Sequence, residues 1–186
     1  MASKTSITSE QAVEQLPVIV LADDEWEFRK SAIRWISEAY NVSKAEREAA
    51  ISAVGADDSE QDFHIIRTAE LEFLIVANLE ALWSTIASEF RDRRRLVVFL
   101  DLRWEGEGES LFAIREMRQN KDMQHYPVIV YSKSDSESDI KNSYDHTANA
   151  YLTKSGSSDE RKKKFLKTVK QWTTVTTPPF VSYENN

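Results

Sequence analysis

The chain has 186 residues, of which 41% are hydrophobic and 30% charged, and its net charge is −7. This length and composition suit one α/β domain with extensions. The acidic balance argues against nucleic acid as a direct partner, because phosphate backbones are bound by clustered Lys and Arg. The chain has no cysteine, which excludes disulfides, thiolate chemistry and Cys-based zinc sites.

No stretch approaches the roughly 18 consecutive apolar residues that a membrane-spanning helix needs. Residues 1–16 are polar and lack the apolar run of a signal peptide. We therefore expect residues 1–16 to form an N-terminal arm, and we expect a cytoplasmic protein without a membrane partner. The basic runs at 93–95 and 161–164 are interpreted as solvated helix faces.

Residues 17–22, with the sequence PVIVLA, form the first predicted strand. A continuous run of apolar, β-branched residues is typical of a strand buried on both faces, as in a parallel sheet. Asp23 and Asp24 follow it directly, so we expect them at the carboxyl edge of the sheet, where α/β proteins place their chemistry. A helix is predicted next, over about residues 25–40.

A second, short helix is predicted over about residues 44–54. Ser43 is a good N-cap, and Glu46 stands three residues later, which is the capping-box pattern. Residues 56–62 then form an acidic loop.

Two interpretations stay open for residues 63–90. In the first, FHIIRT at 63–68 is the second strand, and one long helix follows with an apolar stripe from Leu71 to Phe90. In the second, EFLIVA at 72–77 is the strand, and the helix begins near Asn78. Neither choice moves the candidate site residues.

After Arg95 the pattern is clear again. Strands are predicted at residues 96–100, 127–131 and 148–153. Helices are predicted at residues 110–119, within 133–146, and from Ser158 or Asp159 to about Trp172. Residues 173–186 are predicted to form a tail. Five strands that alternate with helices predict an α/β fold with a parallel sheet and helices on both faces. No repeat or low-complexity linker indicates a second folded domain.

Four of the five predicted strands end in a distinct polar group. Asp23 and Asp24 follow the first strand, Asp101 the third, Ser132 the fourth and Lys154 the fifth. Because the carboxyl ends of parallel strands meet at one edge of the sheet, we expect these side chains to converge.

The chemistry of this set is specific. Carboxylates that lie close together repel, and a hard cation such as Mg²⁺ relieves the repulsion with oxygen ligands. A carboxylate can attack a phosphoryl group and form an acyl phosphate. A lysine supplies positive charge to the phosphoryl oxygens and a hydroxyl supplies a hydrogen bond. The set therefore predicts a phosphoryl-transfer site that has a nucleophile, a metal-binding site, a cationic side chain and a hydroxyl group.

The sequence resembles bacterial response-regulator receiver domains, the CheY-like family. The matching stretches are VIVLADDE (18–25), VVFLDL (97–102), PVIVYSKS (127–134) and ANAYLTKS (148–155). The resemblance implies a five-stranded, doubly wound parallel sheet of the flavodoxin-like type, with strand order 2-1-3-4-5, over residues 17–172. The ending YLTKS, with the late Trp172 and the Pro-containing tail, is also similar to the single-domain regulators that partner bacterial phytochromes.

The resemblance also assigns roles. Asp101 would accept the phosphoryl group, and Lys154 would bind it. Ser132 would be the switch hydroxyl, and Tyr151 the aromatic switch residue.

The implied cofactor is Mg²⁺. Asp24 would ligate it directly and Asp23 mainly through water. Asp101 would also hold the ion, and the backbone carbonyl of Arg103 would be a further ligand.

The implied partners are a sensor histidine kinase or phosphotransfer protein and a downstream protein. Such a protein is a signalling switch of a two-component phosphorelay; it catalyses only its own phosphorylation and dephosphorylation and is not otherwise an enzyme. Only residues 173–186 follow the predicted last helix, so we expect no direct DNA binding. Homodimer formation through the face of the fourth helix, fifth strand and fifth helix, or through the tail, stays open.

Three features depart from the family pattern. The loop at 103–109, RWEGEGE, carries acids at 105–109 where receivers usually have Pro and Asp-Gly. Ser155 follows Lys154 in place of the usual Pro, so we expect a trans peptide bond there. The segment between the first and third strands is longer than usual, mostly through an insert at about 43–62.

Two rival functions remain. A pseudo-receiver would keep the fold as a binding module without a phosphoryl cycle. A phosphohydrolase of the haloacid dehalogenase type also attacks from an Asp at a strand end, but it needs a second acid two residues later, where this chain has Arg103.

Overall fold

The computed structural model describes residues 16–54, 63–89, 95–103 and 108–176. Its strands are β1 (Val18–Ala22), β2 (Phe63–Arg67), β3 (Glu72–Val76), β4 (Leu96–Leu100), β5 (Val128–Ser132) and β6 (Ala150–Thr153). Its helices are α2 (Trp26–Ala39), α3 (Lys44–Ala53), α4 (Leu79–Glu89), α5 (Glu109–Gln119), α6 (Glu137–Asp145), α7 (Ser158–Lys170) and the π-helix η1 (Gln171–Val175). Within these residues no helix has the length and apolar character of a membrane span.

The strands form one sheet in the order β2-β3-β1-β4-β5-β6. Neighbouring strands are parallel from β3 to β6, whereas β2 pairs antiparallel with β3. The predicted parallel order 2-1-3-4-5 is therefore present as β3-β1-β4-β5-β6. The predicted count of five strands was wrong, because β2 adds an edge strand.

The extra strand arises from the region that the sequence left ambiguous. Residues 63–67 and 72–76 are both strands, joined by a tight turn at 68–71. The Thr68 hydroxyl donates to the Leu71 carbonyl at 2.8 Å and accepts from its N–H at 2.9 Å, so one side chain closes the turn. The long helix over 71–90 was wrong, and the helix start near Asn78 is confirmed by α4.

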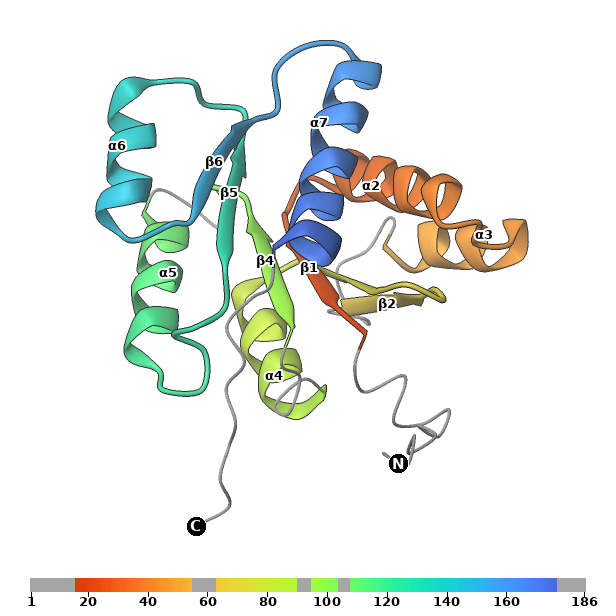
Figure 1. Ribbon diagram of the computed structural model, residues 1–186, viewed down its shortest axis with the longest axis horizontal. Coiled ribbons are helices and arrows are strands. Elements are labelled where there is room, and N and C mark those ends of the chain that lie inside the picture. The colour runs from red at the N-terminus through yellow and green to blue at the C-terminus, as the bar shows by residue number, and fades with distance from the viewer. Residues whose placement is uncertain (1–15, 55–62, 90–94, 104–107, 177–186) are drawn as a thin grey trace, which may run out of the picture.

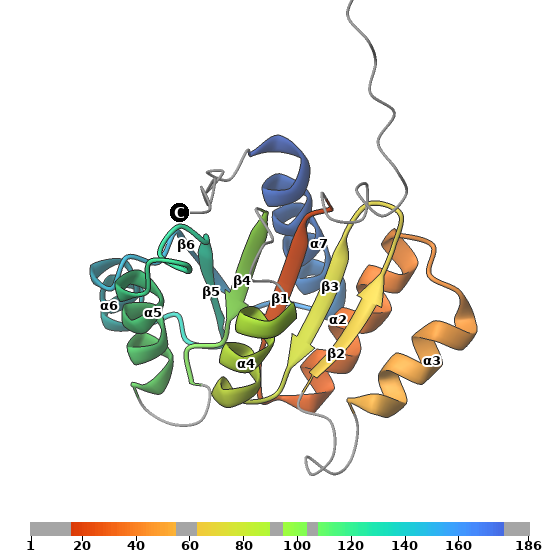
Figure 2. The same ribbon diagram turned by 90° about the horizontal axis from the view of Figure 1, so that it is seen from below.

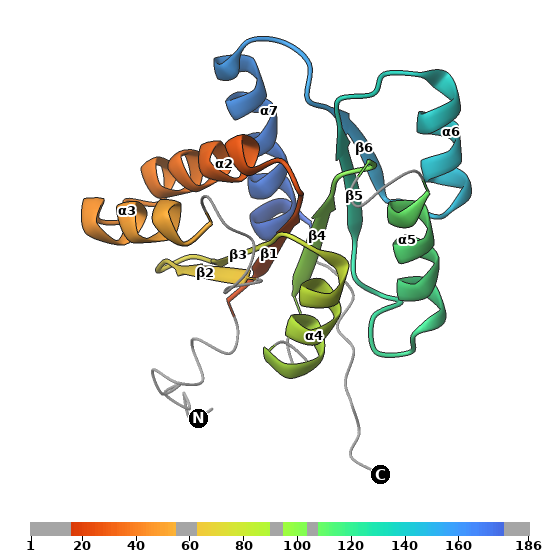
Figure 3. The same cartoon turned by 180° about the vertical axis from the view of Figure 1, so that it is seen from behind.

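Helices cover both faces of the sheet, as Figures 1 and 3 show from opposite sides, and an apolar layer lies on each face. Alternate residues of β1 face different layers, with Val18 and Val20 in the layer under α4 and α5, and Ile19 and Leu21 in the layer under α2, α3 and α7. Every residue of β1 is fully buried. This explains the uninterrupted apolar run, because a strand covered on both faces has no solvent side.

Local capping signals were mostly confirmed. Ser43 and Glu46 form the capping box that opens α3. The cap of α7 is Ser157, one residue earlier than predicted, and it also forms a capping box. Residues 55–62, the acidic end of the predicted insert, lie outside the described residues, as do the arm at 1–15 and the tail from 177.

Gly108, not Ser110, is the N-cap of α5, with a left-handed φ of 91° that favours glycine. Beyond α7, η1 extends the helical chain to Val175, through the first residues of the predicted tail. The described chain contains no cis peptide bond, so the bond after Lys154 is trans as predicted.

Candidate functional site

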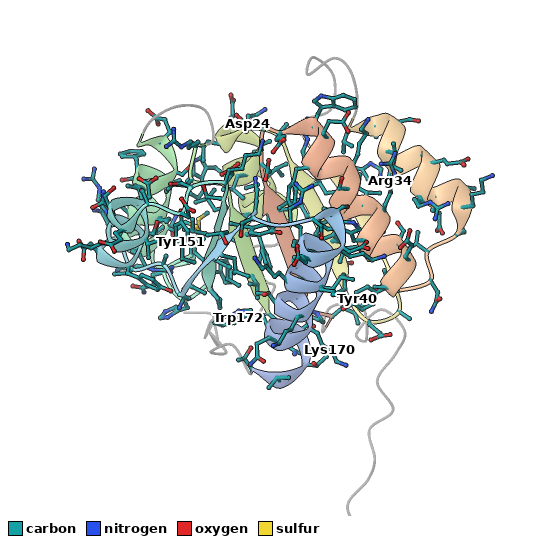
Figure 4. All side chains as sticks on the ribbon, turned by 90° about the horizontal axis from the view of Figure 1, so that it is seen from above. Asp24, Arg34, Tyr40, Tyr151, Lys170 and Trp172 are labelled. Carbon is teal, nitrogen blue, oxygen red and sulfur yellow. The ribbon has the colours of Figure 1, made fainter. Side chains whose placement is uncertain are left out.

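The candidate site lies at the carboxyl edge of the sheet, between β1 and β4. These strands are in register at Ala22 and Leu100, so Asp23 and Asp101 leave them side by side. The Asp101 N–H donates to the Ala22 carbonyl at 2.9 Å, which extends the ladder by one bond. Because β1 pairs with β3 on one side and β4 on the other, this is the topological switch point where doubly wound folds bind ligands. In Figure 4, seen from above, Asp24 lies at the end of the sheet opposite Tyr40, Lys170 and Trp172.

Lys154 joins the two buried carboxylates. It follows β6, and its N–H donates to the Ser132 carbonyl at 2.6 Å. Its Nζ lies 2.6 Å from Asp23 Oδ2 and 2.7 Å from Asp101 Oδ2, and its side chain is fully buried. Three of the predicted site residues are thus brought together by three strand ends.

Asp24 completes an acidic cluster on the solvent side. It is exposed, whereas Asp23 is fully buried and Asp101 is 8% exposed. One carboxylate oxygen from each of the three lies within 4.8 Å of the others. Hard divalent cations prefer such all-oxygen sets, so the donor chemistry and spacing fit a divalent metal.

The Arg103 carbonyl stays a predicted ligand. The Arg103 N–H donates to Asp101 Oδ1 at 3.4 Å, and the exposed guanidinium lies 3.8 Å from Asp139 Oδ2. Glu109 begins α5, and the other acids of this loop, at 105 and 107, lie outside the described residues.

Charge and burial oppose each other at Asp23. Burial, with a further contribution from Asp101, raises the pKa of Asp23 from 3.8 to about 7, against the lowering effect of Lys154. For Lys154, burial lowers the pKa, but the charges of Asp23 and Asp101 outweigh it, and the net shift is upward. The lysine therefore stays protonated, while Asp23 takes up a proton more readily than an ordinary carboxylate.

These shifts predict a stability that depends on pH in the metal-free protein. Because the pKa of Asp23 is higher in the folded state than in the unfolded state, proton binding by Asp23 stabilises the fold. This stabilisation is complete below the ordinary pKa of 3.8 and is lost as the pH rises through about 7. We expect the free energy of unfolding to fall by roughly 2–3 kcal/mol between about pH 5 and about pH 8 from this group. Urea titrations with a chelator, on wild type and Asp23→Asn, measure the difference.

Asp23→Asn should remove this part of the pH dependence, whereas Asp145→Asn, at the exposed end of α6, should keep it. Parallel pH profiles for wild type and Asp23→Asn would contradict the prediction. Because a proton and a divalent cation compete for Asp23, any affinity of the cluster for a divalent cation should also rise over the same pH interval.

The two predicted switch residues are connected through one backbone unit. Ser132 is fully buried, and its Oγ accepts from the Ser134 N–H at 3.2 Å. Tyr151 donates from its hydroxyl to the Ser134 carbonyl at 2.9 Å. Burial raises the pKa of Tyr151 above its usual value, so the phenol keeps its proton. Ser134 is thus held on both sides by the two residues.

Sequence reasoning missed three contacts around the site. Arg29 is buried and donates from Nη1 to the Asp23 carbonyl at 2.8 Å. Ser110 donates to the Asp101 carbonyl at 2.5 Å, which explains why it is buried inside α5. Lys133 pairs with Glu25 at 2.7 Å between the β5–α6 and β1–α2 loops. Helical spacing alone signals none of them, since each depends on which elements are neighbours.

An exposed tryptophan lies beside the acidic cluster. Trp26 opens α2 close to the acidic cluster; it is 46% exposed, and Lys30 Nζ lies 3.3 Å from the centre of its ring. Trp104 lies outside the described residues.

The fold and site together define a doubly wound α/β protein with an acid–lysine cluster at its switch point. Solved structures with the same fold are response regulators. The Mn²⁺-bound form of response regulator Rcp1 is 23% identical at a TM-score of 0.60, over 88% of this chain and 99% of that chain. The phosphorylated cyanobacterial phytochrome response regulator RcpA is 22% identical at a TM-score of 0.61, over 88% of this chain and 99% of that chain.

A response regulator in red-light signalling of R. palustris is 19% identical at a TM-score of 0.64, over 89% of this chain and all of that chain. No family model and no curated protein matched the sequence. The chain therefore has the fold of response-regulator receiver domains, including phytochrome-associated ones.

Proposed function

We propose that this protein is a response regulator of a two-component phosphorelay, in which Asp101 accepts a phosphoryl group and thereby changes protein–protein binding. The observation that carries the proposal is the buried Lys154 ammonium, which bridges Asp23 and Asp101 at the switch point of a receiver fold. A buried cation shared by two carboxylates is costly to maintain for stability alone, because desolvation offsets much of the attraction.

The proposed metal is Mg²⁺, held by Asp23, Asp24 and Asp101 with the Arg103 carbonyl. When bound, it neutralises charge on the phosphoryl oxygens and on the carboxylates. The other roles belong to the chain itself.

In the proposed reaction a carboxylate oxygen of Asp101 forms a bond to phosphorus, while the bond from phosphorus to the donor breaks. The donor is a phosphohistidine nitrogen of a kinase or phosphotransfer protein, or the oxygen of a small acyl phosphate, and it leaves with the bonding electron pair. Lys154 stabilises the added negative charge on a phosphoryl oxygen, and Ser132 donates a hydrogen bond to another.

The proposed output starts at Ser134. When the Ser132 hydroxyl turns toward the phosphoryl group, its hydrogen bond from the Ser134 N–H breaks. Ser134 is then no longer fixed in place, so the hydrogen bond from the Tyr151 hydroxyl to its carbonyl weakens and the Tyr151 ring can change position. Tyr151 lies on β6 between α6 and α7, so these elements form the proposed output face.

We propose residues 17–172 as the receiver, with 1–16 as an arm, about 43–62 as an insert and 173–186 as a tail. The proposed partners are a sensor histidine kinase and a downstream protein, with no direct binding to DNA or membrane. A pseudo-receiver differs only in lacking the phosphoryl cycle. The dehalogenase-type hydrolase is disfavoured, because Arg103 stands where that chemistry needs an acid.

Labelling with a small acyl-phosphate donor tests this function. We expect intact-mass spectrometry to show one added phosphoryl group per chain in Mg²⁺ and none in excess chelator. Beryllofluoride with Mg²⁺ should shift NMR signals of residues 132–134 and 151. A pseudo-receiver would give neither result, and steady release of phosphate from many ester substrates would instead support a hydrolase.

A further inference from the structure

Lys154 also lies over two aromatic rings. Its Nζ lies 4.5 Å from the centre of the Phe28 ring and 5.8 Å from that of Tyr131. Phe28 is 3% exposed and Tyr131 1% exposed. The buried ammonium group therefore has two anionic oxygens and two ring faces among its neighbours.

The two rings are held rigidly by packing from three elements. Phe28 on α2 meets Tyr131 on β5 edge to face, with centroids 5.2 Å apart and planes at 70°. Both rings also contact Phe165 on α7, at 6.3 Å and 5.9 Å. Because Phe165 is fully buried, neither ring can turn away without disturbing the layer between sheet and helices.

The geometry matches what a buried ammonium requires. Lysine has three N–H donors, and Asp23 and Asp101 accept two of them. Among the residues that the structure describes, no third hydrogen-bond acceptor contacts Nζ, and the Phe28 ring is its nearest aromatic neighbour. The face of an aromatic ring attracts a cation through its quadrupole, most strongly where water is excluded.

We propose that Phe28 and Tyr131 are positioning residues of the phosphoryl site: their rings hold the Lys154 ammonium between Asp23 and Asp101. This rests on the proposed phosphoryl transfer to Asp101. The rings attract the cation without accepting a directed hydrogen bond, so they hold it while leaving it free to move from a carboxylate oxygen to a phosphoryl oxygen. An aliphatic side chain of similar size would fill the space but would not attract the charge.

Fluorinated phenylalanines test this, because added fluorine weakens the ring quadrupole while nearly preserving shape. Mono-, di- and trifluorinated phenylalanine are placed at position 28, and the same series at position 73. Phe73 is the matched control: it is fully buried and contacts Phe165 at 6.2 Å, but it lies on β3. The readouts are the maximal rate of labelling by an acyl phosphate, the donor concentration at half-maximal rate, and the free energy of unfolding.

We expect the maximal labelling rate to fall stepwise along the position 28 series, by about tenfold at the trifluorinated ring, and to stay constant along the position 73 series. Half-maximal donor concentration should change little. Equal rates along the position 28 series would overturn the proposal while leaving phosphoryl transfer to Asp101 intact. Equal losses at both positions would also overturn it, because they would indicate packing alone.

A second measurement separates this inference from the proposed function. Side-chain protons of Lys154 over a ring face should show upfield ring-current shifts in NMR spectra recorded without any donor. Phe28→Leu should abolish most of this shift, and Phe73→Leu should not. If wild type is never labelled, both the proposed function and the positioning role fail. The ring-current shift of the Lys154 protons still reports, independently of labelling, whether the Phe28 ring holds the ammonium. An unshifted Lys154 in wild type would overturn the contact itself.

Discussion

Asp101→Asn is expected to abolish phosphoryl labelling to below detection in the presence of acyl phosphate and Mg²⁺. The substitution keeps the size of the side chain and replaces the anionic nucleophile by a neutral amide, which does not attack phosphorus at a useful rate. Lys154 keeps its bond to Asp23 in this variant, so the fold should persist. Intact-mass spectrometry over a time course, beside wild type, measures the effect.

Asp145→Asn is the matched control, since it neutralises an exposed carboxylate at the end of α6 and should be labelled like wild type. Labelling of Asp101→Asn at the wild-type rate would refute Asp101 as the acceptor, and mapping the modified peptide would identify the true one. Affinity capture with phosphorylated wild type against Asp101→Asn then isolates downstream partners that depend on the phosphoryl group.

Lys154→Met should cause the second large effect, a loss of about 3–5 kcal/mol in the free energy of unfolding near pH 8 in a chelator. Methionine keeps much of the apolar stem but removes the cation that lies within hydrogen-bond distance of both Asp23 and Asp101. Two carboxylates would then face each other at a buried site without compensation. Urea denaturation followed by circular dichroism measures the loss.

Two conditions should reduce the defect of Lys154→Met. Lys154 lowers the pKa of Asp23, so its removal raises that pKa beyond the wild-type value of about 7, and Asp23 should be protonated at pH 6 and lose its proton only at higher pH than in the wild type. The destabilisation should therefore be smaller at pH 6 than at pH 8, and saturating Mg²⁺ should restore part of it. Lys163→Met, exposed on α7, should show neither effect. A defect in Lys154→Met that is independent of both pH and Mg²⁺ would indicate lost packing, not lost charge.

The sequence by itself determined the parallel part of the sheet and the strand ends at which the candidate site residues lie. The apolar runs that end at Ala22 and Leu100 have no polar face, so they had to be buried on both sides, and parallel strands place their carboxyl ends at one edge. Asp23 and Asp101 were predictable for that reason. The capping box at Ser43 was predictable because it depends only on residues three apart.

Only the tertiary structure decided the contacts between elements far apart in the chain. The β2–β3 hairpin depends on a turn closed by the Thr68 side chain and on the open edge of β3, so neither apolar run reveals it alone. The surroundings of Lys154 were hidden in the same way, because Phe28 and Tyr131 come together only where Phe28 of α2 contacts Tyr131 of β5 and Phe165 of α7. Periodicity reports which face of an element is apolar, whereas the partner of that face is set by the packing of the whole domain.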